Sequence, residues 1–234
     1  LRKRTMIYNS YCVYDLETTS PTPRKTQVVQ IAAKMINSRT LTVIPGSEFQ
    51  SLVQPSFDPE FCALHNLDLL QPGAVAVHGK TEAMLRKAPT LKAVWANFCE
   101  YVNSYNYKGT NWTAPIRVGY NNKGFDDRIL ERVMCDTPWG YGPCSKDKTR
   151  QELFNKYTSI DVYDMMILMF ENDKSVTKMG ADALIRGHMG YAKGEAHDAM
   201  GDVDMTAEVF CKVQRSLRAF AKTKNFEGMF APDE

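Results

Sequence analysis

Two acidic residues at the end of an apolar strand constrain this 234-residue chain more than any other feature. The segment SYCVYDLETTS, residues 10–20, begins with Tyr, Val and Cys, which favour a largely buried strand. Because alternate residues of a strand point to the same face, Asp15 and Glu17 stand side by side. Two adjacent carboxylates repel each other unless a positive group lies between them. The segment therefore predicts a positive partner at the end of this strand.

The composition is that of an ordinary globular protein, with 44% hydrophobic and 24% charged residues. The net charge of +2 is too small to indicate a polyanion partner by itself, and the short basic clusters at 2–4, 146–150 and 222–224 are typical of solvated surface. We expect no membrane partner, because no window is apolar enough to span a bilayer. The six cysteines lack metal-ligand spacing, and several lie in apolar runs. Free thiols in an intracellular reducing compartment (cytoplasm, nucleus or organelle matrix) are favoured, and secretion is not.

The order of the expected elements predicts an α/β fold. The expected strands lie at 10–16, 27–36, 40–53, 115–120 and about 157–161, with a short extended piece at 74–81. The expected helices begin at Thr81, Thr90 and about Gly124, follow the last strand to 170, and cover 176–187 and 198–220, with a loop at 135–150. The first three strands form an antiparallel meander, and later strands alternate with helices. The chain therefore predicts a mixed central sheet flanked by helices, with ligands bound near strand carboxyl ends.

Helical phase selects one acidic residue on each of two later helices. On the helix that begins near Gly124, Asp126 falls in the middle of the apolar side and Asp127 at its edge. On the last helix, Asp202 lies at the margin of the buried stripe, whereas Asp204 points away. An inward carboxylate needs a cation, an arginine or a metal, because burying it alone is costly. For Asp126, a bond to a local backbone amide is the alternative.

His197 is expected in the loop before the last helix, with Asp198 as the helix cap. By itself such a histidine is usually structural. Four carboxylates can converge with it on one end of the sheet: Asp15, Glu17, Asp126 and Asp202. Oxygen-rich sites of this kind favour Mg²⁺ or Mn²⁺, and two such ions can clamp the attacking and leaving oxygens of a phosphodiester. A neutral histidine nearby can take the proton from the attacking water.

Three motifs resemble, in order, those of the DEDDh family of 3′–5′ exonucleases, which has the ribonuclease H-like fold. YDLETT is similar to the family's D-x-E-T, YNNKGFDDRIL to N-x-x-F-D, and HDAMGD to H-x4-D. VHGKT at 77–81 is similar to the family's HGIT, and IDVYDM to its last strand. The segments GYNNKGFDD and AHDAMGDV are most similar to the bacterial exonuclease I branch, which degrades single-stranded DNA. The similarity covers about residues 12 to 210.

Three details refine this resemblance. Lys80 stands where the family usually has an apolar residue. Asp198 stands where a sister class has the tyrosine that replaces the histidine, so the histidine class is the better match. The exonuclease I branch carries accessory domains after the nuclease core, whereas this chain ends soon after its third motif. We expect one exonuclease domain over residues 1–234, with a core at about 8–215, a short basic N-terminal lead and a polar C-terminal tail.

The resemblance implies roles for individual residues. Two divalent ions, Mg²⁺ or Mn²⁺, would be held by Asp15, Glu17, Asp126 and Asp202. His197 would be the general base. The substrate would be contacted by Thr18, Thr19, His78, Asn122 and Phe125. For the two threonines, a turn that closes the strand is the alternative.

The implied partner is the 3′ end of a single-stranded nucleic acid, with DNA favoured and an exoribonuclease as the alternative. A catalytically silent binding module on the same fold predicts a lost carboxylate or histidine, and none is lost. An endonuclease of the ribonuclease H type gives no role to His197. The aromatic stretch YVNSYNYKGTNW at 101–112 can stack bases, although packing of an amphipathic helix and loop is favoured.

Overall fold

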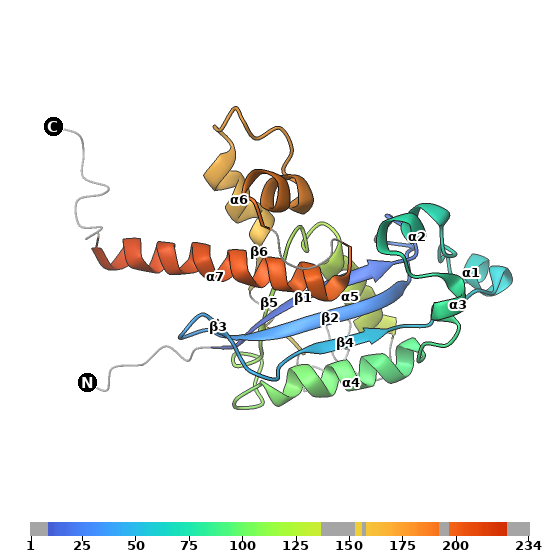
Figure 1. Cartoon of the computed structure of the whole chain (residues 1–234). Coiled ribbons are helices and arrows are strands. Elements are labelled where there is room, and N and C mark those ends of the chain that lie inside the picture. Colours follow the sequence, from blue (N-terminus) through green and yellow to red (C-terminus); the bar gives the residue numbers. More distant parts are fainter. Residues whose placement is uncertain (1–8, 137–152, 156–157, 192–196, 224–234) are drawn as a thin grey trace.

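The computed structural model of the chain describes residues 9–136, 153–155, 158–191 and 197–223 (Figure 1). Its strands are β1 (Tyr11–Thr18), β2 (Val28–Asn37), β3 (Thr42–Val43), β4 (Phe49–Leu52), β5 (Ile116–Gly119) and β6 (Ser159–Asp161). Its helices are α1 (Pro59–Leu64), α2 (Pro72–His78), α3 (Glu82–Leu85), α4 (Leu91–Ser104), α5 (Asp126–Asp136), α6 (Val162–Phe170), the π-helix η1 (Asp182–His188) and α7 (Ala199–Thr223).

The strands form one mixed sheet in the order β3-β2-β1-β5-β6, with β4 also paired to β2. β2 is antiparallel to β1, β3 and β4, whereas β1, β5 and β6 are parallel. The carboxyl ends of β1, β5 and β6 therefore lie at the same edge of the sheet. This confirms the α/β class and the mixed sheet that the order of elements predicts.

The sheet separates two apolar layers. Cys12, Tyr14 and Leu16 of β1 pack with α4 and α5, whereas Tyr11 and Val13 pack with α6, η1 and α7. Figure 1 shows α7 along one side of the sheet and α4 along the other, with α1, α2 and α3 gathered beyond the carboxyl end of β1. Side chains with odd numbers in β1 therefore face α7.

Asp15 and Glu17 lie on the α7 side of the sheet, at the carboxyl end of β1. Glu17 pairs with Gln30 of β2, but the next pair is Thr18 with Val28, so the register shifts at this point. Such a β-bulge increases the local twist and changes the direction of the side chains beside it. The irregularity therefore occurs at the residues with the carboxylates.

Three sequence-based expectations about secondary structure are wrong. The strand expected at 40–53 is divided into β3 and β4, because Pro45 and Gly46, whose φ is 71°, interrupt it. The extended piece expected at 74–81 is mostly helix α2, which begins at Pro72 and is followed by Gly79 in the left-handed conformation. The helix expected at 176–187 is helical only from Asp182.

Other expectations agree with the structure. Thr81 and Thr90 cap α3 and α4 by accepting hydrogen bonds from the amides of Met84 and Ala93. The sequence did not predict the six-residue helix α1, which Asp58 caps. Most of the loop expected at 135–150 falls outside the described residues.

The cysteines differ in state. Cys12, Cys62, Cys99 and Cys211 are free and buried, as their apolar surroundings predict. Cys135, however, is disulfide-bonded, so the expectation of free thiols is wrong at this position. Among the described residues, no helix combines the length and the apolar character that crossing a membrane requires.

Candidate active site

Three carboxylates meet at the carboxyl end of β1. One carboxylate oxygen from each of Asp15, Glu17 and Asp202 lies within 4.8 Å of the other two, and all three residues are half-buried. β1 supplies the first two residues, and the first turn of α7 supplies the third. Oxygens on opposite sides of a bound Mg²⁺ are about 4.2 Å apart, since each metal–oxygen distance is about 2.1 Å. The spacing of the three carboxylates therefore fits a hard divalent cation.

The electrostatics of these carboxylates favour a bound cation. Burial raises the pKa of Asp15 well above its usual value, and the neighbouring charges of Asp126, Glu17 and Asp202 raise it further. Burial also raises the pKa of Glu17 to about 8, although Lys80 opposes the shift. Burial and mutual repulsion thus both disfavour the charged forms of these carboxylates. A bound divalent ion would offset both the loss of hydration and the repulsion.

Asp126 lies close by but is held differently. It is the first residue of α5 and is buried, and its charge raises the pKa of Asp15. Burial raises the pKa of Asp126 itself well above its usual value, while its own backbone amide and that of Leu16 lower it. The structure therefore places Asp126 beside the other carboxylates and also gives it the backbone contacts that the sequence left open as an alternative.

Helical phase predicted Asp127 at the edge of the apolar side, and the structure buries it as deeply as Asp126. Its carboxylate accepts hydrogen bonds from the Tyr14 hydroxyl at 2.5 Å and the Ser159 hydroxyl at 2.7 Å. Arg117 of β5 forms an ion pair with it at 3.3 Å. Phase did not foresee these partners because they come from β1, β5 and β6. Asp127 thus anchors α5 to the sheet.

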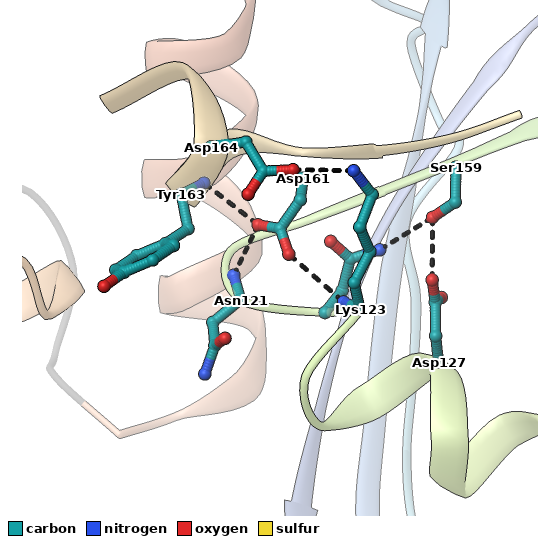
Figure 2. A network of polar contacts seen from close by, with 8 residues as sticks. Asn121, Lys123, Asp127, Ser159, Asp161, Tyr163 and Asp164 are labelled. Carbon is teal, nitrogen blue, oxygen red and sulfur yellow. Dashed lines mark hydrogen bonds and ion pairs between the residues drawn. The ribbon is translucent and has the colours of Figure 1, made fainter. Parts of the chain in front are cut away.

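A second set of hydrogen bonds positions the loop between β5 and α5 (Figure 2). The Asp161 carboxylate, at the end of β6, accepts from the amides of Asn121 at 2.7 Å, Lys123 at 3.1 Å and Tyr163 at 2.9 Å. Asn121 adopts a left-handed φ of 57°, which the loop needs in order to turn into α5. These bonds fix the loop that precedes Asp126.

His197 lines a cavity of about 360 Å³ together with Asp15 and Asp202. Its Nε2 atom is 2.9 Å from a carboxylate oxygen of Asp182, and its side chain is 45% exposed. An imidazole that donates from Nε2 keeps the lone pair of Nδ1 free to accept a proton. Asp182 is thus placed to orient the ring, in the way that a carboxylate orients a catalytic histidine.

Arg186 connects this pair to the carboxylate cluster. Its Nε atom lies 3.1 Å from an oxygen of Asp182, and its Nη2 atom lies 3.1 Å from an oxygen of Asp202. Burial raises the pKa of Asp202, and the hydrogen bond and charge of Arg186 lower it. η1 therefore supplies both residues that link His197 to Asp202.

Asp198 joins the start of α7 to two other parts of the molecule. Its carboxylate accepts from Lys80 at 3.0 Å and from the Gln30 side chain at 3.0 Å, and the amide of Gly201 also hydrogen-bonds to it. The side-chain Oε1 atom of Gln30 in turn accepts from the Ala199 amide. Asp198 therefore caps α7, as the sequence predicts. The buried Lys80, which departs from the family pattern, completes this clamp.

The hydroxyls of the two threonines after Glu17 are used within the protein. Thr18 donates to the Ser20 carbonyl oxygen, and Thr19 bonds to Thr26 and to the Asp68 carbonyl oxygen. Both side chains are buried. The structure thus gives these hydroxyls the closing-turn role, and a contact to a nucleotide through them stays a prediction.

The other three residues expected at the substrate are also held by the protein. Both ring nitrogens of the buried His78 have partners, the Thr18 carbonyl oxygen at 3.3 Å and the Lys80 amide at 2.9 Å. Asn122 is fully buried and donates to Ser159. Phe125 packs against the core layer on the α4 side. Their substrate contacts stay predictions.

The aromatic stretch at 101–112 divides between core and surface. Tyr101 packs on the core layer and donates to the Ser47 carbonyl oxygen, which agrees with the packing alternative. Tyr107 and Trp112 are 76% and 65% exposed.

Several site residues were not selected from the sequence: Gln30, Arg117, Asp161, Asp182 and Arg186. Two of them could have been selected from the sequence, because each is a polar residue within an apolar strand: Gln30 in VVQIAA and Arg117 in PIRVGY. A polar residue within a buried strand implies a buried partner. Asp182 and Arg186 show no such pattern in the sequence, because their link to His197 depends on how η1 packs beside α7.

The chain is similar to a known protein family and to a curated protein. The RNase_T family model, described as an exonuclease, matches residues 12–132. A DNA polymerase III subunit epsilon-like protein of Rhodobacter capsulatus is 26% identical over 214 residues, which cover 90% of this chain and 24% of that protein. The chain thus spans about a quarter of this curated relative.

Two solved structures share the fold. The cell-death related nuclease CRN-4 is 15% identical, with a TM-score of 0.66 over 90% of this chain and 65% of that one. E. coli exonuclease I in complex with a dT13 oligonucleotide is 22% identical, with a TM-score of 0.68 over 97% of this chain and 46% of that one.

The raised pKa of Glu17 predicts how stability varies with pH. The pKa of Glu17 is about 8 in the folded protein and 4.5 in the unfolded chain, so the folded protein binds the proton more tightly. The stability that protonated Glu17 contributes is therefore fully present below pH 4.5 and is lost as the pH rises through about 8. In EDTA, the melting temperature of the wild type relative to Glu17→Gln should fall over this interval. Mn²⁺ should raise the wild-type melting temperature more at the upper end, because cation binding needs ionised carboxylates. A Mn²⁺ effect that is independent of pH, or equal in Glu17→Gln, would contradict the site.

The clamp at the start of α7 predicts energetic coupling between Lys80 and Asp198. In a double-mutant cycle with Lys80→Met and Asp198→Asn, urea unfolding should give a coupling energy of about 1 kcal/mol. A matched cycle on the exposed pair of Arg86 and Glu82 should give about 0.5 kcal/mol or less. Additive effects of the two clamp substitutions would show that Lys80 does not hold α7.

Proposed function

Because the chain belongs to the RNase_T family of exonucleases, and is thus a nuclease of the hydrolase class, we propose that it is a metal-dependent 3′–5′ exonuclease that acts on single-stranded nucleic acid and prefers DNA. Family membership confirms the DEDDh resemblance drawn from the motifs. The observation that carries the proposal is the group of three half-buried carboxylates within 4.8 Å, which shares one cavity with His197. The preference for single-stranded DNA is supported by the shared fold with an exonuclease I bound to dT13.

In the proposed reaction, water attacks the phosphorus of the last phosphodiester bond. The bond from phosphorus to the 3′ oxygen of the preceding nucleotide breaks, which releases a nucleoside 5′-monophosphate and leaves a new 3′-hydroxyl. Divalent cations, when bound, would supply stabilisation of the charge that develops on the phosphate oxygens. Asp15, Glu17 and Asp202 would hold them, and Asp126 would complete the set from the start of α5.

His197 is proposed as the general base. Its Nδ1 atom would take the proton from the attacking water while Nε2–H donates to Asp182. The Asp182 carboxylate then stabilises the imidazolium that forms. Arg186 holds Asp182 and Asp202 at once, so the base and the carboxylate cluster keep a fixed separation. This arrangement gives His197 a use that neither a silent binding module nor a ribonuclease H-type endonuclease would need.

The exonuclease proposal predicts a ladder of products. With Mg²⁺ or Mn²⁺, a 5′-labelled single-stranded oligonucleotide should shorten one nucleotide at a time, and EDTA should stop the reaction. Asp15→Asn should abolish turnover, and His197→Ala should lower kcat by about 10²–10⁴-fold, the usual contribution of a general base. The matched control is Asp204→Asn, which should retain activity. Asp204 also lies on α7, but it forms an ion pair with Lys34.

Two outcomes would overturn these assignments. An intact substrate in the presence of metal would exclude the exonuclease, and full activity in His197→Ala would remove the general base. The same series with matched single- and double-stranded DNA and RNA decides the substrate. Faster shortening of RNA than of DNA would replace the DNA preference by the exoribonuclease alternative.

A further inference from the structure

A second concave surface lies on the face of the sheet opposite Asp15 and Glu17. It has a volume of about 700 Å³ and is bordered by α1, α4, α5 and the loop between β1 and β2. Val28 and Val133, which line it, belong to the core layer on the α4 side, so the surface lies on that face of the sheet. We call this surface the basic groove, and its charged and aromatic rim consists of Arg24, Phe61, His65, Lys92 and Arg132.

The basic groove is uniformly positive or neutral. Its rim includes Arg24, Lys92 and Arg132, and none of the described residues that line it is acidic. Arg24 and Lys92 are exposed, and no ion pair within the described part of the chain takes up either charge. Arg132 is fixed in place, because its guanidinium donates to the carbonyl oxygens of Arg24 and Thr26. A net charge of only +2 for the whole chain makes this local concentration of cations notable. Its complement is a polyanion.

The basic groove also presents an exposed aromatic pair. Phe61 is 44% exposed, and its ring centroid lies 4.2 Å from that of His65. Phe61 lies within α1, and His65 is the residue after the helix, about one turn later. Cations that follow a phosphate backbone beside aromatic rings that stack bases are the combination by which proteins bind single strands.

The basic groove and the carboxylate cluster are neighbours around the end of the sheet. Val28, which lines the groove, pairs with Thr18, the residue after Glu17. α5 connects the two sites directly, since Asp126 begins the helix and Arg132 follows six residues later. At 1.5 Å per residue, this separation is about 9 Å along the helix axis. One strand with its 3′ end at the carboxylates can therefore reach the groove.

We infer that the basic groove binds the single-stranded nucleic acid upstream of the cleaved nucleotide, with Arg24 and Lys92 on phosphates and the Phe61–His65 pair against a base. This inference rests on the proposed exonuclease function and adds a substrate-binding site to it. An acidic protein segment would also match the charge, but the direct path along α5 from the carboxylate cluster favours the nucleic acid.

The test compares a long with a minimal substrate. The Arg24→Ala/Lys92→Ala variant should bind a fluorescent dT16 oligonucleotide, measured by anisotropy in EDTA, about tenfold more weakly than the wild type at 0.1 M salt. The slope of log Kd against log salt concentration should decrease by about 1.4, since each lost contact to a single strand contributes about 0.7. Hydrolysis of the dinucleotide dTdT should keep the wild-type kcat/KM, because a dinucleotide is too short to occupy both sites.

Two further variants isolate the groove. Arg39→Ala/Lys174→Ala removes the same charge from exposed positions outside the groove and should leave the salt slope unchanged. Phe61→Ala should weaken dT16 binding without changing the salt slope, because it removes stacking but no phosphate contact.

The outcomes separate this inference from the proposed function. If the wild type hydrolyses dTdT but the groove variant binds dT16 like the wild type, the inference is wrong and the exonuclease stands. If binding of dT16 is unchanged while an acidic peptide loses affinity for the variant, the groove is a protein-binding site and the inference is overturned. If the wild type hydrolyses neither substrate, the proposed function itself fails.

Discussion

Repulsion among half-buried carboxylates at the carboxyl end of β1 governs how the surrounding elements are arranged. Asp15 and Glu17 share a face of the strand, Asp202 approaches them from α7, and burial raises the pKa of all three. A fold gains nothing from such crowding by itself, because desolvation and repulsion both oppose it. The crowding is stable only with positive groups nearby, and a bound divalent ion is the strongest of these.

The protein holds the cluster with polar contacts that come from distant parts of the chain. Gln30 and Lys80 fix the start of α7 through Asp198, and Arg186 approaches Asp202 from η1. Asp161 fixes the loop before α5. Asp198 and Asp202 lie at the start of α7, and Asp161 caps α6. The first turn of a helix has unpaired backbone amides that need partners. The site is therefore rigid although its ligands come from elements that are far apart in sequence.

The sequence predicted the parts of this site that depend on local periodicity. Alternation in β1 placed Asp15 and Glu17 together, and helical phase turned Asp202 rather than Asp204 toward them. Phase alone did not reveal the full burial of Asp127, because its partners come from β1, β5 and β6. Asp182 could not be predicted at all, since its contact with His197 depends on the packing of η1 beside α7.

The fold was likewise predicted where it depends on local sequence patterns. The mixed sheet followed from the order of the expected elements, but residues 74–81, which follow Pro72 and Gly73, were predicted as extended. Pro72 at the first position of α2 and Gly79 immediately after its last residue were the better signals in the sequence. His78, the last residue of α2, is buried against β1, where its ring contacts the Thr18 carbonyl oxygen. A local sequence pattern does not contain this long-range contact.

Anomalous diffraction from crystals soaked in Mn²⁺ at pH 8 tests the cation site most directly. A carboxylate cluster built for a hard divalent ion predicts an anomalous peak bounded by the oxygens of Asp15, Glu17 and Asp202, next to Asp126. The peak should disappear in Glu17→Gln crystals or be strongly reduced. The absence of any peak at these carboxylates in wild-type crystals, or a peak only at another place, would contradict the proposed metal centre.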